Sequence, residues 1–157
     1  MKIILLAVGK IDEKTVTNAV EMYSKRVNHY IAFETETIPD IKNNKNLSQD
    51  EQKLAEGIAI LKKLQASDCV ILLDDKGKPY SSTEFAHFIE KKSHSTPKRM
   101  VFVVGGPYGF SDDVYARANE KLSLSRMTFT HQMVRVIFAE QLYRAMTILN
   151  NEPYHHE

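Results

Sequence analysis

The sequence lacks an excess of charge of either sign. Its 157 residues contain 21 Lys and Arg against 20 Asp and Glu, which gives a formal net charge of +1. A protein that holds nucleic acid by charge alone needs a strongly basic balance. Any contact with nucleic acid is therefore expected to be local, through a basic patch or a groove between two subunits.

Cysteine and long apolar runs are also scarce. The single cysteine, Cys69, excludes an intramolecular disulfide and a zinc site built from several cysteines, and its place in the run CVILL indicates a buried small side chain. No run reaches the length of a membrane span, and the apolar part of the opening MKIILLAVGK is too short for a signal peptide. We expect a cytoplasmic protein that does not associate with a membrane.

Several catalytic motifs are missing as well. There is no HExxH, no G-x-S-x-G and no cluster of His and Cys, so zinc and serine-hydrolase chemistry are disfavoured. The glycine-rich segment 105–109 has neither the Gly-Lys-Ser/Thr of a Walker loop nor the spacing of a dinucleotide fingerprint. Asp74 and Asp75 are adjacent on a predicted strand end, where neighbours point to opposite faces, so we expect them not to share a site.

Apolar runs and helical patterns alternate along the whole chain. Buried or half-buried strands are predicted at residues 2–8, 31–38, 69–73, 100–104 and 122–124. Helices are predicted between the strands. Two of these helices are predicted to begin at the capping boxes Ser48 with Glu51 and Ser81 with Glu84. Residues 39–46 are predicted to be a polar loop and residues 75–79 a turn. We expect residues 1–157 to form a single α/β domain with a parallel sheet covered by helices on both faces.

Two loops with special residues follow the last two predicted strands. The glycine-rich segment 105–109 follows one, and the polar pair Ser125-Arg126 follows the other. A glycine loop lets a flat ligand lie against bare backbone, although a tight strand-to-helix turn explains it equally well on its own. Because ligands bind beyond the carboxyl ends of parallel strands, we expect a site where these two loops meet.

The final predicted helix, from His131 to about Leu149, carries charged side chains in an apolar segment. His131 and Arg135 are four residues apart and would share a face, where an arginine is either solvated or bound to an anion such as phosphate. Glu140 and Arg144 are expected to pair with each other. The helix has more apolar positions than one packed face needs, which predicts a homodimer interface.

The tail 152–157 reads EPYHHE and can be a frayed end or a functional segment. An aromatic ring can stack on a base, and an imidazole can assist proton transfer near neutral pH. The pair Tyr154-His155 is therefore a candidate for substrate positioning or acid–base catalysis.

Taken together, these segments resemble the RlmH type of SPOUT methyltransferase over the whole chain. The matching motifs, in order, are AVGK, the central GKP turn, VGGPYG, LSLSRMTF, HQMVRV, EQLYRA and the closing PYH. The resemblance implies an α/β SPOUT fold with a C-terminal trefoil knot. It also implies a homodimer that binds S-adenosylmethionine at the subunit interface and needs no metal. The implied reaction is methylation of N3 of a pseudouridine in 23S rRNA, in the large subunit or the assembled ribosome.

The resemblance further implies which residues form the site. The cofactor residues would be Leu73, Gly105, Leu124, Ser125, Arg126, Met127, Thr128 and Phe129. The residues near the substrate or in catalysis would be His131, Arg135, Arg144, Tyr154 and His155.

The sequence departs from the family pattern at two positions. Thr130 stands where the family often has Pro, and His156 stands where it often has Lys or Arg. The first departure should change only the helix cap, and the second should make the contact of the tail with phosphate weaker or pH-dependent. The sequence leaves open which residue is the general base. It also leaves open a SPOUT enzyme acting on another RNA and a non-catalytic dimer that binds nucleotide or RNA.

Overall fold

The computed structural model describes residues 1–42, 44–95 and 98–157. Five parallel strands form one sheet in the order β2-β1-β4-β3-β5. The strands are β1 (Lys2–Val8), β2 (Ala32–Ile38), β3 (Cys69–Pro79), β4 (Arg99–Val104) and β5 (Glu120–Ser123). The helices are α1 (Lys14–Val27), α2 (Gln49–Lys63), α3 (Ser82–Ser95), α4 (Asp112–Arg117) and α5 (Met133–Leu149), with a 3-10 turn η1 (Asn44–Asn46).

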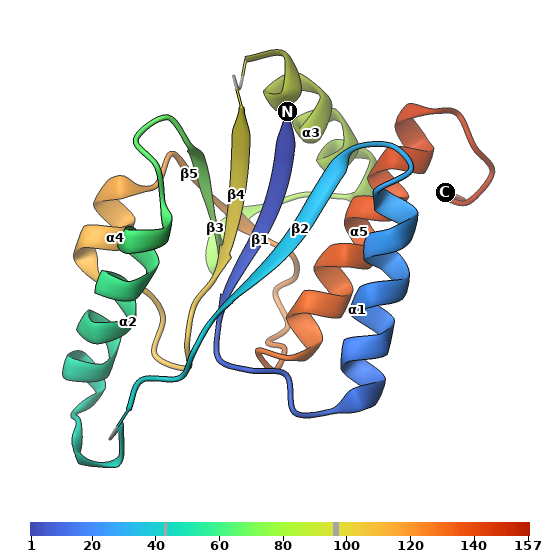
Figure 1. Ribbon diagram of the computed structural model, residues 1–157. Helices are drawn as coiled ribbons and strands as arrows, with labels where there is room; N and C mark the ends of the chain where they lie inside the picture. Colours follow the sequence, from blue (N-terminus) through green and yellow to red (C-terminus); the bar gives the residue numbers. More distant parts are fainter. Residues whose placement is uncertain (43, 96–97) are drawn as a thin grey trace.

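Helices cover both faces of the sheet, which confirms the predicted architecture. α1, α3 and α5 lie on one face, and α2 and α4 lie on the other (Figure 1). Alternate residues of β1 supply the two cores: Ile3 and Leu5 face the first group of helices, and Ile4 and Leu6 face the second. Because each core uses every second residue, both faces of a central strand are apolar, as its continuous apolar run predicts.

The helix α5 is flanked by α1 and α3 on the same face of the sheet (Figure 1). Phe138 lies at the centre of this layer. The centre of its ring is 4.7 Å from that of Phe102 and 6.2 Å from that of Phe85. Contact with the sheet and with two helices uses most of the apolar width of α5. That width alone therefore does not require a partner subunit.

The two predicted capping boxes start helices as expected. The Ser81 N–H donates to Glu84 Oε2 at 2.7 Å, and the Glu84 N–H donates to Ser81 Oγ at 3.1 Å. The Glu51 N–H donates to Ser48 Oγ at 3.1 Å at the start of α2. In each helix the capping side chain satisfies an N–H that has no partner within the helix.

The predicted turn over residues 75–79 is wrong, because β3 continues to Pro79. The pairing of β3 with β5 shifts register between Leu73 and Lys78, so the residues between them bulge out. Gly77 allows this: a Cβ at Gly77 would lie 2.6 Å from the Leu122 nitrogen, a gap that only glycine fits. The predicted polar loop over 39–46 contains η1, and its residue 43 lies outside the described residues.

Candidate functional site

A cleft of about 520 Å³ opens at the carboxyl ends of β3, β4 and β5. These ends are where the two special loops were expected to meet, so the predicted position is confirmed. Apolar side chains and glycine backbone provide most of its wall. It is lined by Leu73, Asp74, Asp75, Val104, Gly105, Gly106, Pro107, Gly109, Phe110, Leu124, Ser125, Met127, Thr128, Phe129, Thr130, His131 and Val134.

The structure brings together most of the residues expected to hold the cofactor. Leu73 closes β3, Gly105 opens the glycine loop, and the segment 124–129 follows β5. Arg126 is the exception in that segment, since its side chain is exposed and lies outside the cleft wall.

The glycine loop is shaped by close contacts on its inner side. A Cβ on Gly105 would lie 2.9 Å from the ring of Phe110, which is itself buried and lines the cleft. Gly109 has a φ of +81°, a conformation that side chains disfavour, and its N–H donates to the Gly106 carbonyl at 3.3 Å. The loop therefore folds back on itself and leaves bare backbone facing the cleft.

The loop after β5 is held by its own serines. Ser123 Oγ donates to the Ser125 carbonyl at 2.9 Å, and Ser125 Oγ accepts from the Met127 N–H at 2.9 Å. These local bonds fix the loop and leave the Met127 side chain 77% exposed at the cleft.

Asp74 and Asp75 both line the cleft, which corrects the expectation that they do not share a site. They fall in the bulge of β3, where the alternation of a regular strand is lost. Asp74 accepts hydrogen bonds from the Tyr115 hydroxyl at 2.6 Å and from the Lys76 N–H at 3.0 Å. Burial opposes ionisation of Asp74, but these hydrogen bonds outweigh burial and lower its pKa.

The start of α5 lies two residues later than predicted. The helix begins at Met133, whose N–H donates to Thr130 Oγ1 at 3.2 Å, so Thr130 closes a turn that contains His131. The His131 side chain is exposed and lines the cleft. It therefore does not share a helical face with Arg135.

Arg135 is buried and binds backbone carbonyls. Its guanidinium donates to the carbonyls of Val8, at 3.0 Å, and of Gly9, and its Nε donates to the His131 carbonyl at 3.2 Å. Burial lowers its pKa, and the nearby carboxylate of Asp40 partly offsets this effect. Arg135 thus ties the end of β1 to the turn that presents His131, and three carbonyls occupy the place of the expected phosphate.

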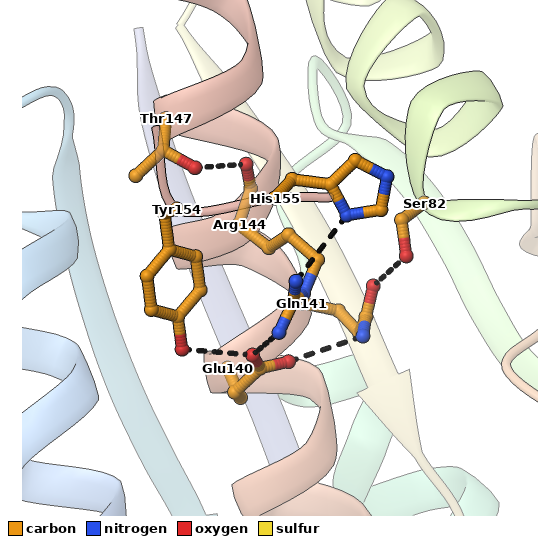
Figure 2. Close-up of polar contacts among 7 residues, drawn as sticks. All are labelled: Ser82, Glu140, Gln141, Arg144, Thr147, Tyr154 and His155. Atoms are coloured by element: carbon orange, nitrogen blue, oxygen red, sulfur yellow. Dashed lines mark hydrogen bonds and ion pairs between the residues drawn. The ribbon is translucent and has the colours of Figure 1, made fainter. Parts of the chain in front are cut away.

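The other three candidates gather at the far end of α5. Arg144 pairs with Glu140 at 2.6 Å, as the sequence predicts, and Tyr154 donates to the same Glu140 oxygen at 3.0 Å (Figure 2). Arg144 also lies 3.2 Å from His155 Nδ1 and 4.7 Å from the centre of the Tyr154 ring. We call Glu140, Arg144, Tyr154 and His155 the tail cluster.

The tail turns back onto the helix because of one residue. Asn151 has a φ of +56°, and the following Glu152 N–H donates to the Thr147 carbonyl at 2.9 Å, an arrangement typical of a helix C-terminus. Glu152 then accepts a hydrogen bond from the Tyr30 hydroxyl at 2.7 Å. The tail is therefore folded against α1 and α5, which excludes the frayed end.

Burial and the hydrogen bond to Glu140 raise the pKa of Tyr154 to about 12. In this conformation the hydroxyl keeps its proton near neutral pH and acts as a donor. α5 begins beside the carboxyl ends of the strands and runs back toward the opposite edge of the sheet (Figure 1). Since a helix rises about 1.5 Å per residue, Arg144 lies about 15 Å along the axis from Val134 in the cleft wall.

The buried carboxylate of Glu56, behind the glycine loop, was not predicted from the sequence. The helical spacing of Leu54, Ile58, Leu61 and Leu64 predicts a buried apolar face, but Leu54 and Ile58 are 53% and 50% exposed, while Glu56, Gly57 and Ile60 are buried. The face is rotated because Gly57 packs against Ser111: a Cβ on Gly57 would lie 3.0 Å from the Ser111 Cβ. In the sequence, this contact is indicated only by the adjacent pair Glu56-Gly57, which lies one turn from apolar residues of the predicted helix.

Within residues 1–42, 44–95 and 98–157, no group of three or more His, Cys, Asp or Glu side chains is arranged to hold a metal ion. Over the same ranges, no helix is long and apolar enough to cross a membrane.

A model of the SPOUT methyltransferase family, described as predicted SPOUT methyltransferase, matches residues 1–155. The chain is 61% identical over 157 residues to ribosomal RNA large subunit methyltransferase H of Parabacteroides distasonis, with all of both chains covered. It is 57% identical to the protein of the same name from Phocaeicola vulgatus, again over the whole of both chains.

The fold is similar to that of a solved probable methylase family protein from Haemophilus influenzae. The TM-score is 0.52 at 13% sequence identity, covering 99% of this chain and 70% of the other. With the parallel sheet and the cleft at its carboxyl edge, these similarities define a SPOUT-type methyltransferase fold. The chain belongs to the SPOUT methyltransferase family, and its nearly full-length matches lie within the large-subunit ribosomal RNA methyltransferase H group.

Proposed function

We propose that the protein transfers a methyl group from S-adenosylmethionine to N3 of a pseudouridine in 23S rRNA of the large ribosomal subunit. The observation that carries this proposal is the cleft, which gathers seven of the eight expected cofactor residues in a chain 61% identical to a methyltransferase H. Residues 1–157 would act as one SPOUT domain, with the C-terminal trefoil knot of its family, in the cytoplasm and away from membranes.

The cleft fits the proposed cofactor in size and in chemistry. About 520 Å³ lies within the range of pockets that hold small cofactors. Apolar side chains such as Leu73, Leu124 and Phe129 can enclose a purine, while backbone groups of the glycine loop can hydrogen-bond its edge. When bound, S-adenosylmethionine supplies an electrophilic methyl group, so we propose that no metal is needed.

The chain must align the acceptor nitrogen and remove its proton. Pseudouridine N3 carries a proton and is a poor nucleophile until that proton leaves. Of the five proposed catalytic residues, His131 alone lines the cleft, and its imidazole can hold or accept a proton near neutral pH. Arg135 would act as a positioning residue, because its three hydrogen bonds to carbonyls fix the turn that presents His131.

The tail cluster would complete the site from a second subunit. Within one chain the cleft and the tail cluster lie near opposite ends of α5, so the two can form one site only across a homodimer. Met127 and Met133, which are 77% and 44% exposed beside the cleft, support an interface there. Arg144 and His155 would then meet the RNA backbone or base, and Tyr154 would position it as a donor.

The proposal is tested by methyl transfer from labelled S-adenosylmethionine to rRNA that lacks the modification. We expect incorporation at one pseudouridine N3 in large-subunit RNA, and a comparison of intact ribosomes with isolated subunits identifies the assembly stage. Incorporation only into another RNA would favour a SPOUT enzyme of different specificity. Binding of S-adenosylmethionine without transfer to any RNA would favour a non-catalytic binding dimer. Light scattering at micromolar concentration should give the mass of a dimer.

A further inference from the structure

One buried carboxylate is not accounted for by the fold. Glu56 is 3% exposed, and its Oε1 accepts a hydrogen bond from Gln52 Nε2 at 3.1 Å. Its Oε2 is buried and has no hydrogen-bond partner among the described residues. Burial raises the pKa of Glu56, and the hydrogen bond from Gln52 only partly opposes this. An ionised carboxylate in such a place costs stability, and ion pairing within the fold does not offset it.

This carboxylate lies directly behind the glycine loop. A Cβ on Gly106 would lie 2.6 Å from the Glu56 Cδ and closer still to Oε2. Gly106 also lines the cleft, so only its backbone separates the carboxylate from the ligand space. The Gly106 backbone N–H favours the charged form of Glu56. A glycine here allows close approach from both sides.

Other acidic groups surround the same edge of the sheet. Asp40 lies near Glu56 and disfavours its ionisation, and its Oδ1 is 3.0 Å from the point that a Cβ on Gly9 would occupy. Asp74 and Asp75 stand in the cleft wall opposite the glycine loop. The guanidinium of Arg135, which lies near Asp40, keeps its charge while it donates to backbone carbonyls, so it offsets only part of the charge of the four carboxylates.

We propose that Glu56 is a positioning and specificity-determining residue whose negative charge, acting through the Gly106 backbone, favours a cationic ligand in the cleft. This inference rests on the proposed function, because S-adenosylmethionine carries a positive sulfonium. S-adenosylhomocysteine, which remains after methyl transfer, lacks that charge. The ionised form of Glu56 behind the loop therefore binds the donor more tightly than the product and helps product release.

The test compares the two ligands by calorimetry in the full-length protein and in Glu56→Gln, which keeps size and removes the charge. We expect the dissociation constant for S-adenosylmethionine to rise about tenfold, which corresponds to about 1.4 kcal/mol. The dissociation constant for S-adenosylhomocysteine should change less than about twofold, because a neutral sulfur feels little of the charge. Glu51→Gln, the same change at an exposed position of α2, should alter neither constant.

The outcomes separate this inference from the proposed function. An equal loss for both ligands means that Glu56 only supports the loop and overturns the inference, as does no change for either ligand. If the unaltered protein binds neither ligand, the proposed function itself fails. If Glu56→Gln does not fold, Glu56→Met, uncharged and of similar length, carries the same expected ratio of affinities and the same two contradicting results.

Discussion

The cleft and the tail cluster are built in opposite ways. The cleft has a wall of glycine backbone, apolar side chains and an exposed His131. In the tail cluster, Glu140 alone accepts from both Arg144 and Tyr154. A cofactor must enter and leave a wall that is already formed, whereas the tail must be held in one place until RNA arrives. This difference supports the proposal of a preformed cofactor site and a separately anchored substrate segment.

The largest effect is expected from removing the imidazole at the cleft. His131→Ala should lower the rate of methyl transfer by about 10²–10⁴-fold, because His131 is the one catalytic candidate in the cleft wall. The affinity for S-adenosylmethionine should change little, since backbone and apolar groups provide most of the wall. Single-turnover transfer and calorimetry separate these two results. A rate near that of the unaltered protein would indicate that a residue of the tail, and not His131, assists the proton transfer.

Deleting residues 153–157 tests the other region. Methyl transfer should fall sharply while cofactor affinity stays unchanged, because the cleft lies elsewhere on the chain. The melting temperature should also fall, because the centre of the Tyr154 ring lies 4.7 Å from that of Tyr143 and the Tyr154 hydroxyl donates to Glu140. We therefore expect a decrease of roughly 5 °C, measured by calorimetry. In the undeleted chain, Tyr154→Phe keeps the ring and should retain most of the stability that the deletion removes. A melting temperature as low as that of the deletion variant would argue against stabilisation by ring packing.

Gly105→Val should weaken cofactor binding through Phe110. The new side chain would overlap the Phe110 ring, which lies 2.9 Å from the Cβ position, and push it into the cleft. Overpacking of this kind costs about 1–3 kcal/mol, so affinity should fall about 5- to 150-fold. Gly109→Ala is the control, since no atom lies within 4 Å of its Cβ position and only its φ of +81° is strained. Equal affinity in the Gly105 variant would remove this loop from the cofactor site.

The smallest expected effect is the dependence of stability on the charge of Glu56. Its pKa is raised above the ordinary 4.5 in the folded protein, so folding favours the protonated form. The contribution to stability is present below the ordinary pKa and is lost as the pH rises through the raised one. The melting temperature of Glu56→Gln, relative to the unaltered protein, should therefore increase between about pH 4 and about pH 8. A constant difference would show that Glu56 has an ordinary pKa.

Much of this fold could be predicted from the sequence because each element has a local cause. The continuous apolar run of β1 and the capping box at Ser81 are readable without any partner, and the structure confirms both. The position of the cleft followed from the order of strands and loops. The predictions that failed depend on contacts between distant residues. The extension of β3 depends on the fit of Gly77 against β5, and the rotation of α2 depends on Gly57 against Ser111.

The candidate site divides in the same way. The loops after Val104 and Leu124 could be located from their place after predicted strands, whereas the set of residues 124–129 was implied by the family resemblance. The role of Arg135 could not be predicted in this way. A charged residue in an apolar helix gives the same sequence pattern whether it binds phosphate or donates to the carbonyl of Gly9, 126 residues away. The role of Glu56 could not be predicted either, since its burial depends on a loop fifty residues further along the chain.

The central claim is that the cleft of one subunit works with the tail cluster of another, and mixed dimers test it most directly. Subunits with Gly105→Val are combined with subunits that lack residues 153–157, after unfolding and refolding together. At a concentration of S-adenosylmethionine that saturates the unaltered cleft but not the weakened Gly105→Val cleft, each parent dimer should methylate rRNA at only a small fraction of the unaltered rate. Half of the dimers formed at random are mixed, and each has one intact cleft facing one intact tail, so methyl transfer should recover to about a quarter of the unaltered rate. No recovery, with mixed dimers present, would contradict the claim and require that each cleft be served by its own tail.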